Sequence, residues 1–225
     1  MIGRNALGLC GLLLCAGPAA AALPPAMAPL ADYLMPRDAE ISLARSAAPP
    51  SISANATVLV LGPHGYETAA SGTNGFTCLV ERGWEAGFGD PDFWNARLRG
   101  PLCFNAEAAR TVWPAHKERT DWVLAGLGMA QMRERASASA LAHAAPAPGA
   151  MCFMMSKDGY LSSTGGHWHP HLMFYLSGAG AASWGANQPG SPVIGGAGDP
   201  EPVVTYMVLV PKWSDGSPAM EMAEP

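Results

Sequence analysis

Residues 57–81, TVLVLGPHGYETAASGTNGFTCLVE, decide the fold of this chain. The segment holds apolar, β-branched runs at 57–61 and 76–81, and two turn sequences at 62–65 and 71–75. Turn residues between short apolar runs are typical of antiparallel strands joined by hairpins. We therefore predict a three-stranded antiparallel meander over this segment.

Three segments outside the meander have the apolar spacing and the capping residues of helices: residues 38–45, 106–125 and 129–143. Asn105 is a preferred N-cap residue for the second of them, and Pro114 fits the first turn of its continuation. The polar side chains of this second segment are expected to face solvent: His116, Glu118, Arg119 and Asp121.

Strand patterns return after the helices. Residues 151–156, 170–176 and 203–210 have the composition of strands, whereas the Gly- and Pro-rich segments 83–101 and 178–202 are typical of long loops. Strands, then helices, then strands again indicate an α+β architecture. We predict one α+β domain with a mostly antiparallel sheet, helices packed on one face and long Gly/Pro-rich loops.

The composition excludes some classes of protein. The 225-residue chain has 13 Lys and Arg against 18 Asp and Glu, for a net charge of −5. So few basic residues do not make a broad phosphate-binding surface, and we expect no nucleic-acid partner. Hydrophobic residues make up 49% of the chain and charged residues 14%, which is typical of a folded domain and not of a disordered one.

The N-terminal residues have the pattern of a secretory signal peptide. Arg4 precedes an apolar run, Pro18 interrupts that run, and small residues follow at 20–22. A transmembrane helix is the alternative, but it needs about 20 uninterrupted apolar residues. Acylation at Cys15 would place the bulky Leu14 where a small residue normally precedes the modified cysteine.

Cleavage near residue 22 would export the chain to the periplasm or the extracellular space, with no transmembrane segment in the mature protein. The predicted organisation is a signal peptide at 1–22, an N-terminal arm and short helix at 23–50, the α+β domain at 51–216 and a C-terminal tail at 217–225.

Export also changes the expected use of the cysteines. Cleavage leaves Cys78, Cys103 and Cys152, which allow at most one internal pair. In an oxidising compartment a disulfide is the usual fate of such a pair. Cys78 lies in a predicted strand and Cys103 across a Gly/Pro-rich loop from it, so we predict the bridge Cys78–Cys103 and a buried free thiol at Cys152.

Several strings of this chain resemble those of a group of exported bacterial proteins with no characterised activity: GTNGFTC at 72–78, CFN at 103–105, HPHLMF at 169–174, WGAN at 184–187 and WSDG at 213–216. The resemblance extends from residue 52 to residue 216. It implies export and a single shared domain, and it carries no catalytic role.

The string HWHPH at 167–171 is the strongest local signal for chemistry. In an extended segment alternate side chains share a face, so His167, His169 and His171 would project together. Neutral imidazoles bind zinc or copper, which makes these three the candidate metal ligands. The alternative is a structural cluster at a strand edge, because same-face residues about 7 Å apart bring two imidazoles to one metal more easily than three.

Trp84, Trp94 and Trp184 lie in predicted loops rich in glycine. Large aromatic side chains in loops either stack on a planar or sugar-like ligand or pin the loop to the core. These tryptophans are therefore candidate ligand-surface residues, with loop pinning as the alternative.

No complete catalytic signature is present in the sequence. Asp90 and Asp92 flank a proline, which is typical of a turn, and no serine-hydrolase elbow or phosphate-binding loop is found. We expect an exported, monomeric binding or envelope protein with a small-molecule or envelope partner and a weak divalent-metal contact at the histidines. The alternative function is a metal-dependent hydrolase that uses the same histidines.

Overall fold

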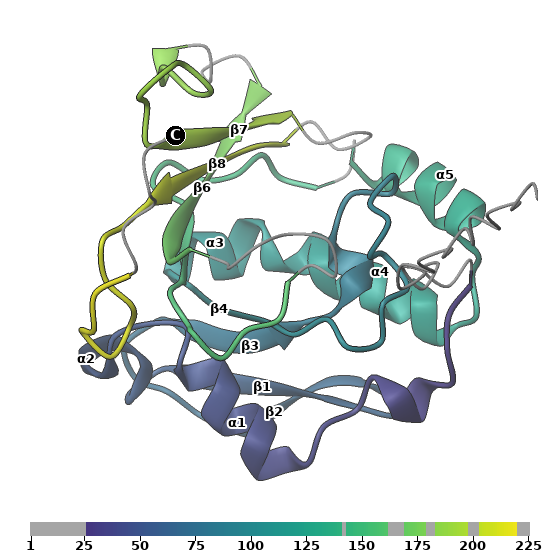
Figure 1. Cartoon of the computed structure of the whole chain (residues 1–225). Helices are drawn as coiled ribbons and strands as arrows, with labels where there is room; N and C mark the ends of the chain where they lie inside the picture. Colours follow the sequence, from purple (N-terminus) through teal and green to yellow (C-terminus); the bar gives the residue numbers. More distant parts are fainter. Residues whose placement is uncertain (1–25, 141–142, 162–168, 179–182, 198–202, 220–225) are drawn as a thin grey trace, which may run out of the picture.

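A computed structural model describes residues 26–140, 143–161, 169–178, 183–197 and 203–219 (Figure 1). The described strands are β1 (Thr57–Gly62), β2 (Gly65–Ala70), β3 (Thr77–Glu81), β4 (Gly100–Phe104), β5 (Met151–Met154), β6 (His171–Ser177), β7 (Val193–Ala197) and β8 (Val203–Leu209). The described helices are α1 (Arg37–Arg45), α2 (Pro50–Ser53), α3 (Ala106–Thr111), α4 (Trp113–Leu124) and α5 (Met129–Ser139), with 3-10 turns η1 (Leu30–Asp32) and η2 (Gly83–Glu85).

All the described strands belong to one eight-stranded sheet in the order β2-β1-β3-β4-β5-β6-β8-β7. Neighbouring strands are antiparallel except for β1 and β3, which are parallel. The prediction of an α+β fold built on one mostly antiparallel sheet is therefore confirmed.

The first three strands differ from the predicted meander. β1 and β2 form the expected hairpin, but β3 lies on the other side of β1 and runs parallel to it. The connecting loop passes so close to the start of β1 that a Cβ atom on Gly72 would lie 2.2 Å from the Thr57 nitrogen. Glycine at this position is what allows the crossing, and the Gly72 N–H donates a hydrogen bond to Thr57 Oγ1.

β7 lies wholly in the predicted loop 178–202, and β4 begins in the last two residues of the predicted loop 83–101. β4 is wholly buried between β3 and β5, although it begins with Gly100 and Pro101, residues that normally mark turns. β7 lies in the Gly-rich region and pairs with β8 at one edge of the sheet. The ladder between β4 and β5 is short, with Cys103 opposite Phe153 and Phe104 opposite Cys152.

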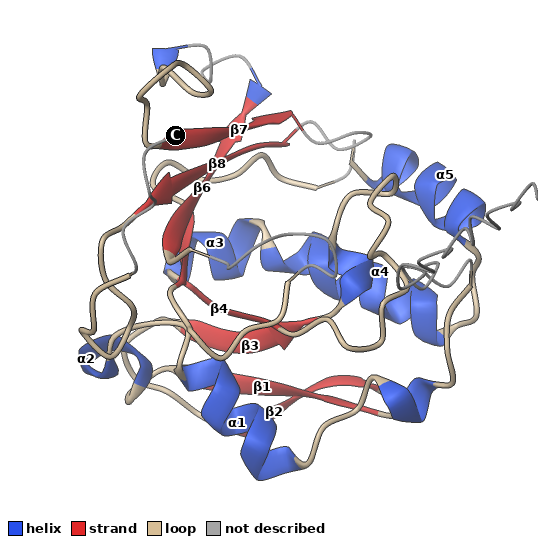
Figure 2. Cartoon of the chain, in the orientation of Figure 1, coloured by secondary structure: helices blue, strands red, loops and turns tan. Residues whose placement is uncertain are grey.

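Helices cover both faces of the sheet. Cys78 and Val80 of β3 pack with Ala44 of α1, whereas Leu79 of β3 packs with Ala108 of α3. Because side chains alternate along a strand, these contacts lie on opposite faces. The prediction that the helices pack on one face holds for the larger layer, α3 to α5, and is wrong for α1, which covers the other face over β1, β3 and β4 (Figure 2).

The predicted disulfide is confirmed. Cys78 of β3 and Cys103 of β4 are directly opposite in the ladder, with their Cα atoms 4.0 Å apart. The bridge lies inside the core and joins two neighbouring strands. Cys152 is a free, buried cysteine whose Sγ is 3.3 Å from the hydroxyl of Tyr175, and burial raises the pKa of its thiol well above the usual value. Cys152 is therefore no thiolate nucleophile in this state.

Candidate functional site: a cavity with buried acid and imidazole groups

A cavity of about 750 Å³ lies between the sheet and helices α3 to α5. This volume is in the range of small-molecule sites. The apolar part of its wall includes Val112, Ala115, Trp122, Ala140, Met154, Leu161, Met173, Tyr175 and Val203, and the polar part includes Glu81, Glu85, His116, Glu118, Ser139 and His143. It therefore combines mostly apolar walls with a few grouped polar side chains.

Two carboxylates and an imidazole meet in one wall of this cavity. Glu81 is the last residue of β3 and, two residues after Leu79, has its side chain on the α3–α4 face of the sheet. Glu85 ends η2, and His116 lies in the first half of α4. The His116 Nδ1 atom is 2.8 Å from Glu81 Oε1 and 3.4 Å from Glu85 Oε2.

The second carboxylate oxygen of Glu85, Oε1, is held by a hydrogen bond from α4. This oxygen accepts a hydrogen bond of 2.8 Å from the hydroxyl of Thr120, which itself accepts one of 3.0 Å from Trp84 Nε1. The Glu85 side chain is only 3% exposed. This burial raises the pKa of Glu85 to about 7, against the opposing charges of His116 and Arg119.

For His116, the neighbouring carboxylates shift the pKa more than burial does. Burial alone lowers the pKa of its imidazole, but the contact with Glu81 and the charges of Glu81 and Glu85 raise it above the ordinary value. The ring also packs edge-on against Phe104, with 5.6 Å between ring centroids. Since both carboxylates face Nδ1, we assign the proton of the neutral ring to Nδ1 and leave Nε2 as the acceptor.

Arg119 fixes the turn that carries Glu85. The expectation that Arg119 faces solvent is wrong, because it is buried and its Nη1 donates hydrogen bonds to the carbonyls of Trp84, Glu85 and Ala86. Its guanidinium also lies 4.6 Å from the centroid of the Phe88 ring. The expectation of an exposed His116 is also wrong, because its ring lies against Glu81 and Glu85 and its side chain is only 19% exposed.

A second polar group lies in the cavity wall, where α4 and α5 approach each other. The Ser139 hydroxyl donates a hydrogen bond to Glu118 Oε2, and His143 Nε2 is 3.3 Å from both the Ser139 Oγ and that Glu118 oxygen. Ser139 and Glu118 thus contact the same ring nitrogen of His143, Nε2. A nucleophile–base–acid relay needs them on different nitrogens, so this group does not have that geometry.

The predicted histidine cluster is only partly within the described residues. His167 lies outside them, His169 is half-buried, and His171 is buried with its Nδ1 2.9 Å from the carbonyl oxygen of His169. Burial lowers the pKa of His171 to about 4. Within the described ranges, no group of three or more His, Cys, Asp or Glu side chains is placed to hold a metal ion, and the zinc or copper contact stays a prediction.

Two of the three candidate tryptophans are in the core. Trp84 and Trp94 are buried and pack in one cluster with Phe93, so they pin the 83–101 loop and present no ligand surface. Trp184 is half-buried and stacks on Tyr206, with 5.4 Å between ring centroids. The alternative of loop pinning therefore describes Trp84 and Trp94.

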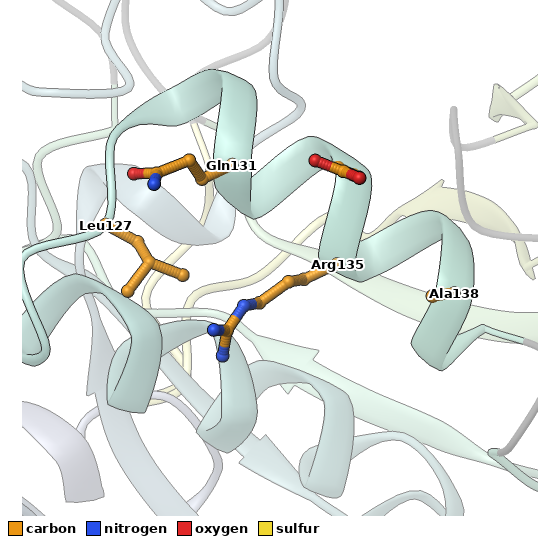
Figure 3. Close-up of a pocket in the computed structure, with 5 residues that line it drawn as sticks. Leu127, Gln131, Arg135 and Ala138 are labelled. Carbon is orange, nitrogen blue, oxygen red and sulfur yellow. The ribbon is translucent and has the colours of Figure 1, made fainter.

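A smaller hollow of about 380 Å³ lies along α5 (Figure 3). It is lined by Leu127, Gln131, Glu134, Arg135 and Ala138. Figure 3 shows Arg135 extending to the same side of the helix as Leu127. All but one of these residues belong to a single helix and are exposed, so this hollow lacks the buried polar groups of the larger cavity.

Comparison of the chain with protein-family models, with curated protein sequences and with solved structures gave no match. Among the helices of the described ranges, none has the length and apolar character needed to cross a membrane.

Proposed function

We propose that this protein binds a small, mostly apolar molecule in the 750 Å³ cavity and recognises a polar group of that molecule with Glu81, Glu85 and His116. The observation that carries the proposal is the placement of three ionisable side chains, out of bulk water, in the wall of an otherwise largely apolar cavity. Burying ionisable groups is unfavourable, and such groups with shifted pKa values gather at functional sites.

A purely structural role for the three residues is the competing explanation. It requires them only to tie α4 and η2 to the sheet. The size of the adjoining cavity supports binding instead, because a structural ion-pair cluster needs no cavity beside it.

Export and a monomeric state belong to the same proposal. The buried disulfide between Cys78 and Cys103 supports an oxidising compartment, the periplasm or the extracellular space. The polar cluster and the cavity lie within one chain, so binding needs no second copy.

The test is binding of N-phenyl-1-naphthylamine, a neutral apolar dye whose fluorescence rises in an apolar site. Saturable binding is expected for the native protein. Ala115→Phe, which places a ring in the cavity, is expected to weaken it by about tenfold or more, as steric exclusion from a single site predicts.

Ala138→Phe is the matched control, because it fills only the smaller hollow on α5 and should leave binding unchanged. Ala140→Phe enters the larger cavity from the residue that follows α5 and serves as a second variant if Ala115→Phe does not unfold cooperatively. Absence of saturable binding, or equal binding by the cavity variants and the native protein, would overturn the proposal.

A further inference from the structure

The position of His116 gives the cavity a feature that binding alone does not require. Both carboxylates of the cluster, Glu81 and Glu85, face the same ring nitrogen, Nδ1. The ring itself lines the cavity. The nitrogen that remains to meet a bound molecule is Nε2, which the assigned tautomer leaves without a proton.

We infer that His116 is a general base and that the cavity catalyses proton transfer from an activated C–H group of a small, mostly apolar molecule, such as a C–H beside a carbonyl or a C=N group. This inference rests on the proposed binding function. Carboxylates at 2.8 Å and 3.4 Å from Nδ1 stabilise the imidazolium that forms when Nε2 accepts a proton.

The surroundings of His116 favour this role. Glu81 supplies the close carboxylate at 2.8 Å, and Phe104 restricts the ring from one side. The groups facing the imidazole are Glu81, Glu85 and Arg119, whose Nη1 is directed to backbone carbonyls. Burial alone would weaken His116 as a base, because it disfavours the charged imidazolium, and the charges of Glu81 and Glu85 offset this effect.

The proposed step needs no oxidant, metal or co-reactant. Nε2 takes the proton of the substrate C–H bond, and the electron pair of that bond forms a new π bond in the substrate. The electrons displaced by this pair move to the neighbouring carbonyl oxygen or break a bond to a leaving atom. Return of the proton from Nε2 to carbon or to the leaving oxygen restores the neutral imidazole.

The probe for this inference is 5-nitrobenzisoxazole, a small aromatic molecule with one acidic C–H bond. Removal of that proton converts the C–H pair into part of a C≡N bond and breaks the N–O bond, which releases a coloured nitrophenolate. Turnover by the full-length protein above the buffer rate is expected. His116→Gln is expected to lower kcat/KM at least about tenfold, a typical lower bound for loss of a general base.

His64→Gln is the matched control, because His64 is exposed in the turn between β1 and β2, outside the cavity wall. It should leave turnover unchanged. Glu81→Gln tests the same inference through a second residue: without the Glu81 charge the pKa of His116 falls, so the rise of rate with pH moves to lower pH.

The outcomes separate this inference from the proposed function. Binding of N-phenyl-1-naphthylamine without turnover, or equal turnover by the native protein and His116→Gln, would overturn the general-base role and leave the binding function standing. Absence of both binding and turnover would overturn both.

Discussion

Glu40 of α1 and Arg82, which directly follows β3, form an ion pair at 2.8 Å with both side chains buried in the core. The same Glu40 oxygen accepts a hydrogen bond from the Leu61 N–H of β1, and Arg82 Nε donates one to the carbonyl of Tyr33. One pair of side chains thus connects α1, two strands and the N-terminal arm.

Glu40→Gln is expected to destabilise the protein by about 3 kcal/mol, because it leaves a buried guanidinium without its counter-charge. The measurement is the free energy of unfolding by chemical denaturation. Glu67→Gln is the control: Glu67 pairs with Arg37 on the surface, where loss of an ion pair changes stability by about 0.5 kcal/mol or less. Equal effects of the two substitutions would contradict the importance of burial.

The disulfide is expected to supply much of the stability of the central sheet. Closing a loop with a sequence separation of 25 residues stabilises a protein by roughly 3–4 kcal/mol in the chain-entropy model. The double variant Cys78→Ala/Cys103→Ala should lose about this much of the 5–15 kcal/mol that is typical of a domain. Peptide mapping under denaturing conditions should find Cys78 joined to Cys103 and Cys152 alkylated, and a bridge that contains Cys152 would refute this pairing.

Glu85 is expected to make stability depend on pH. The pKa of Glu85 is about 7 in the folded protein, against 4.5 as the ordinary value. Between these values the folded state retains a proton that the unfolded chain has released, so the free energy of unfolding falls as pH rises. The raised pKa of His116 acts in the same direction, because its contribution is present at low pH and is lost as pH rises through the folded pKa.

Glu85→Gln removes the first of these contributions while its amide oxygen can still accept from Thr120. Relative to the native protein, the variant should gain about 2 kcal/mol in free energy of unfolding between about pH 5 and about pH 8. Denaturation curves at the two pH values measure the change. A stability difference that is the same at both would show that Glu85 is ionised throughout the range.

The predicted metal contact is tested by calorimetry with zinc and copper. Binding at His167, His169 and His171 should be weak at about pH 7.5, and it should weaken further at about pH 5.5 because protons compete with the metal for the imidazoles other than that of His171, whose pKa is lowered by burial. His169→Ala should abolish it, whereas His64→Ala should not. Equal binding by the native protein and His169→Ala would leave the histidines with a structural role.

The strands that begin and end with clear turn residues were predictable, and the parts that depend on long-range packing were not. The pattern of residues 57–81 identifies β1, β2 and β3, but it does not predict that β3 pairs with β1. Gly72 permits this pairing, because the chain crosses close to the backbone of Thr57 there. β4 begins with Gly100-Pro101, whose local preference for turns is overridden by pairing on both sides.

The candidate site is the feature that the sequence predicts least well. Glu81, Glu85 and His116 do not form a motif, and His116 lies more than 30 residues from both carboxylates in the chain. They meet only because α4 packs over the end of β3 and over η2. The one local hint is a pair of acidic residues, Glu81 at the end of strand β3 and Glu85 four residues later.

The short ladder between β4 and β5 has a consequence for any molecule held in the cavity. Two residue pairs form the ladder between the β2-β1-β3-β4 part of the sheet and the β5-β6-β8-β7 part, and the cavity wall takes residues from both parts. A molecule in the cavity would contact both parts of the sheet. Its binding free energy would therefore also stabilise the two parts against separation. Occupancy would therefore be felt along the line between β4 and β5.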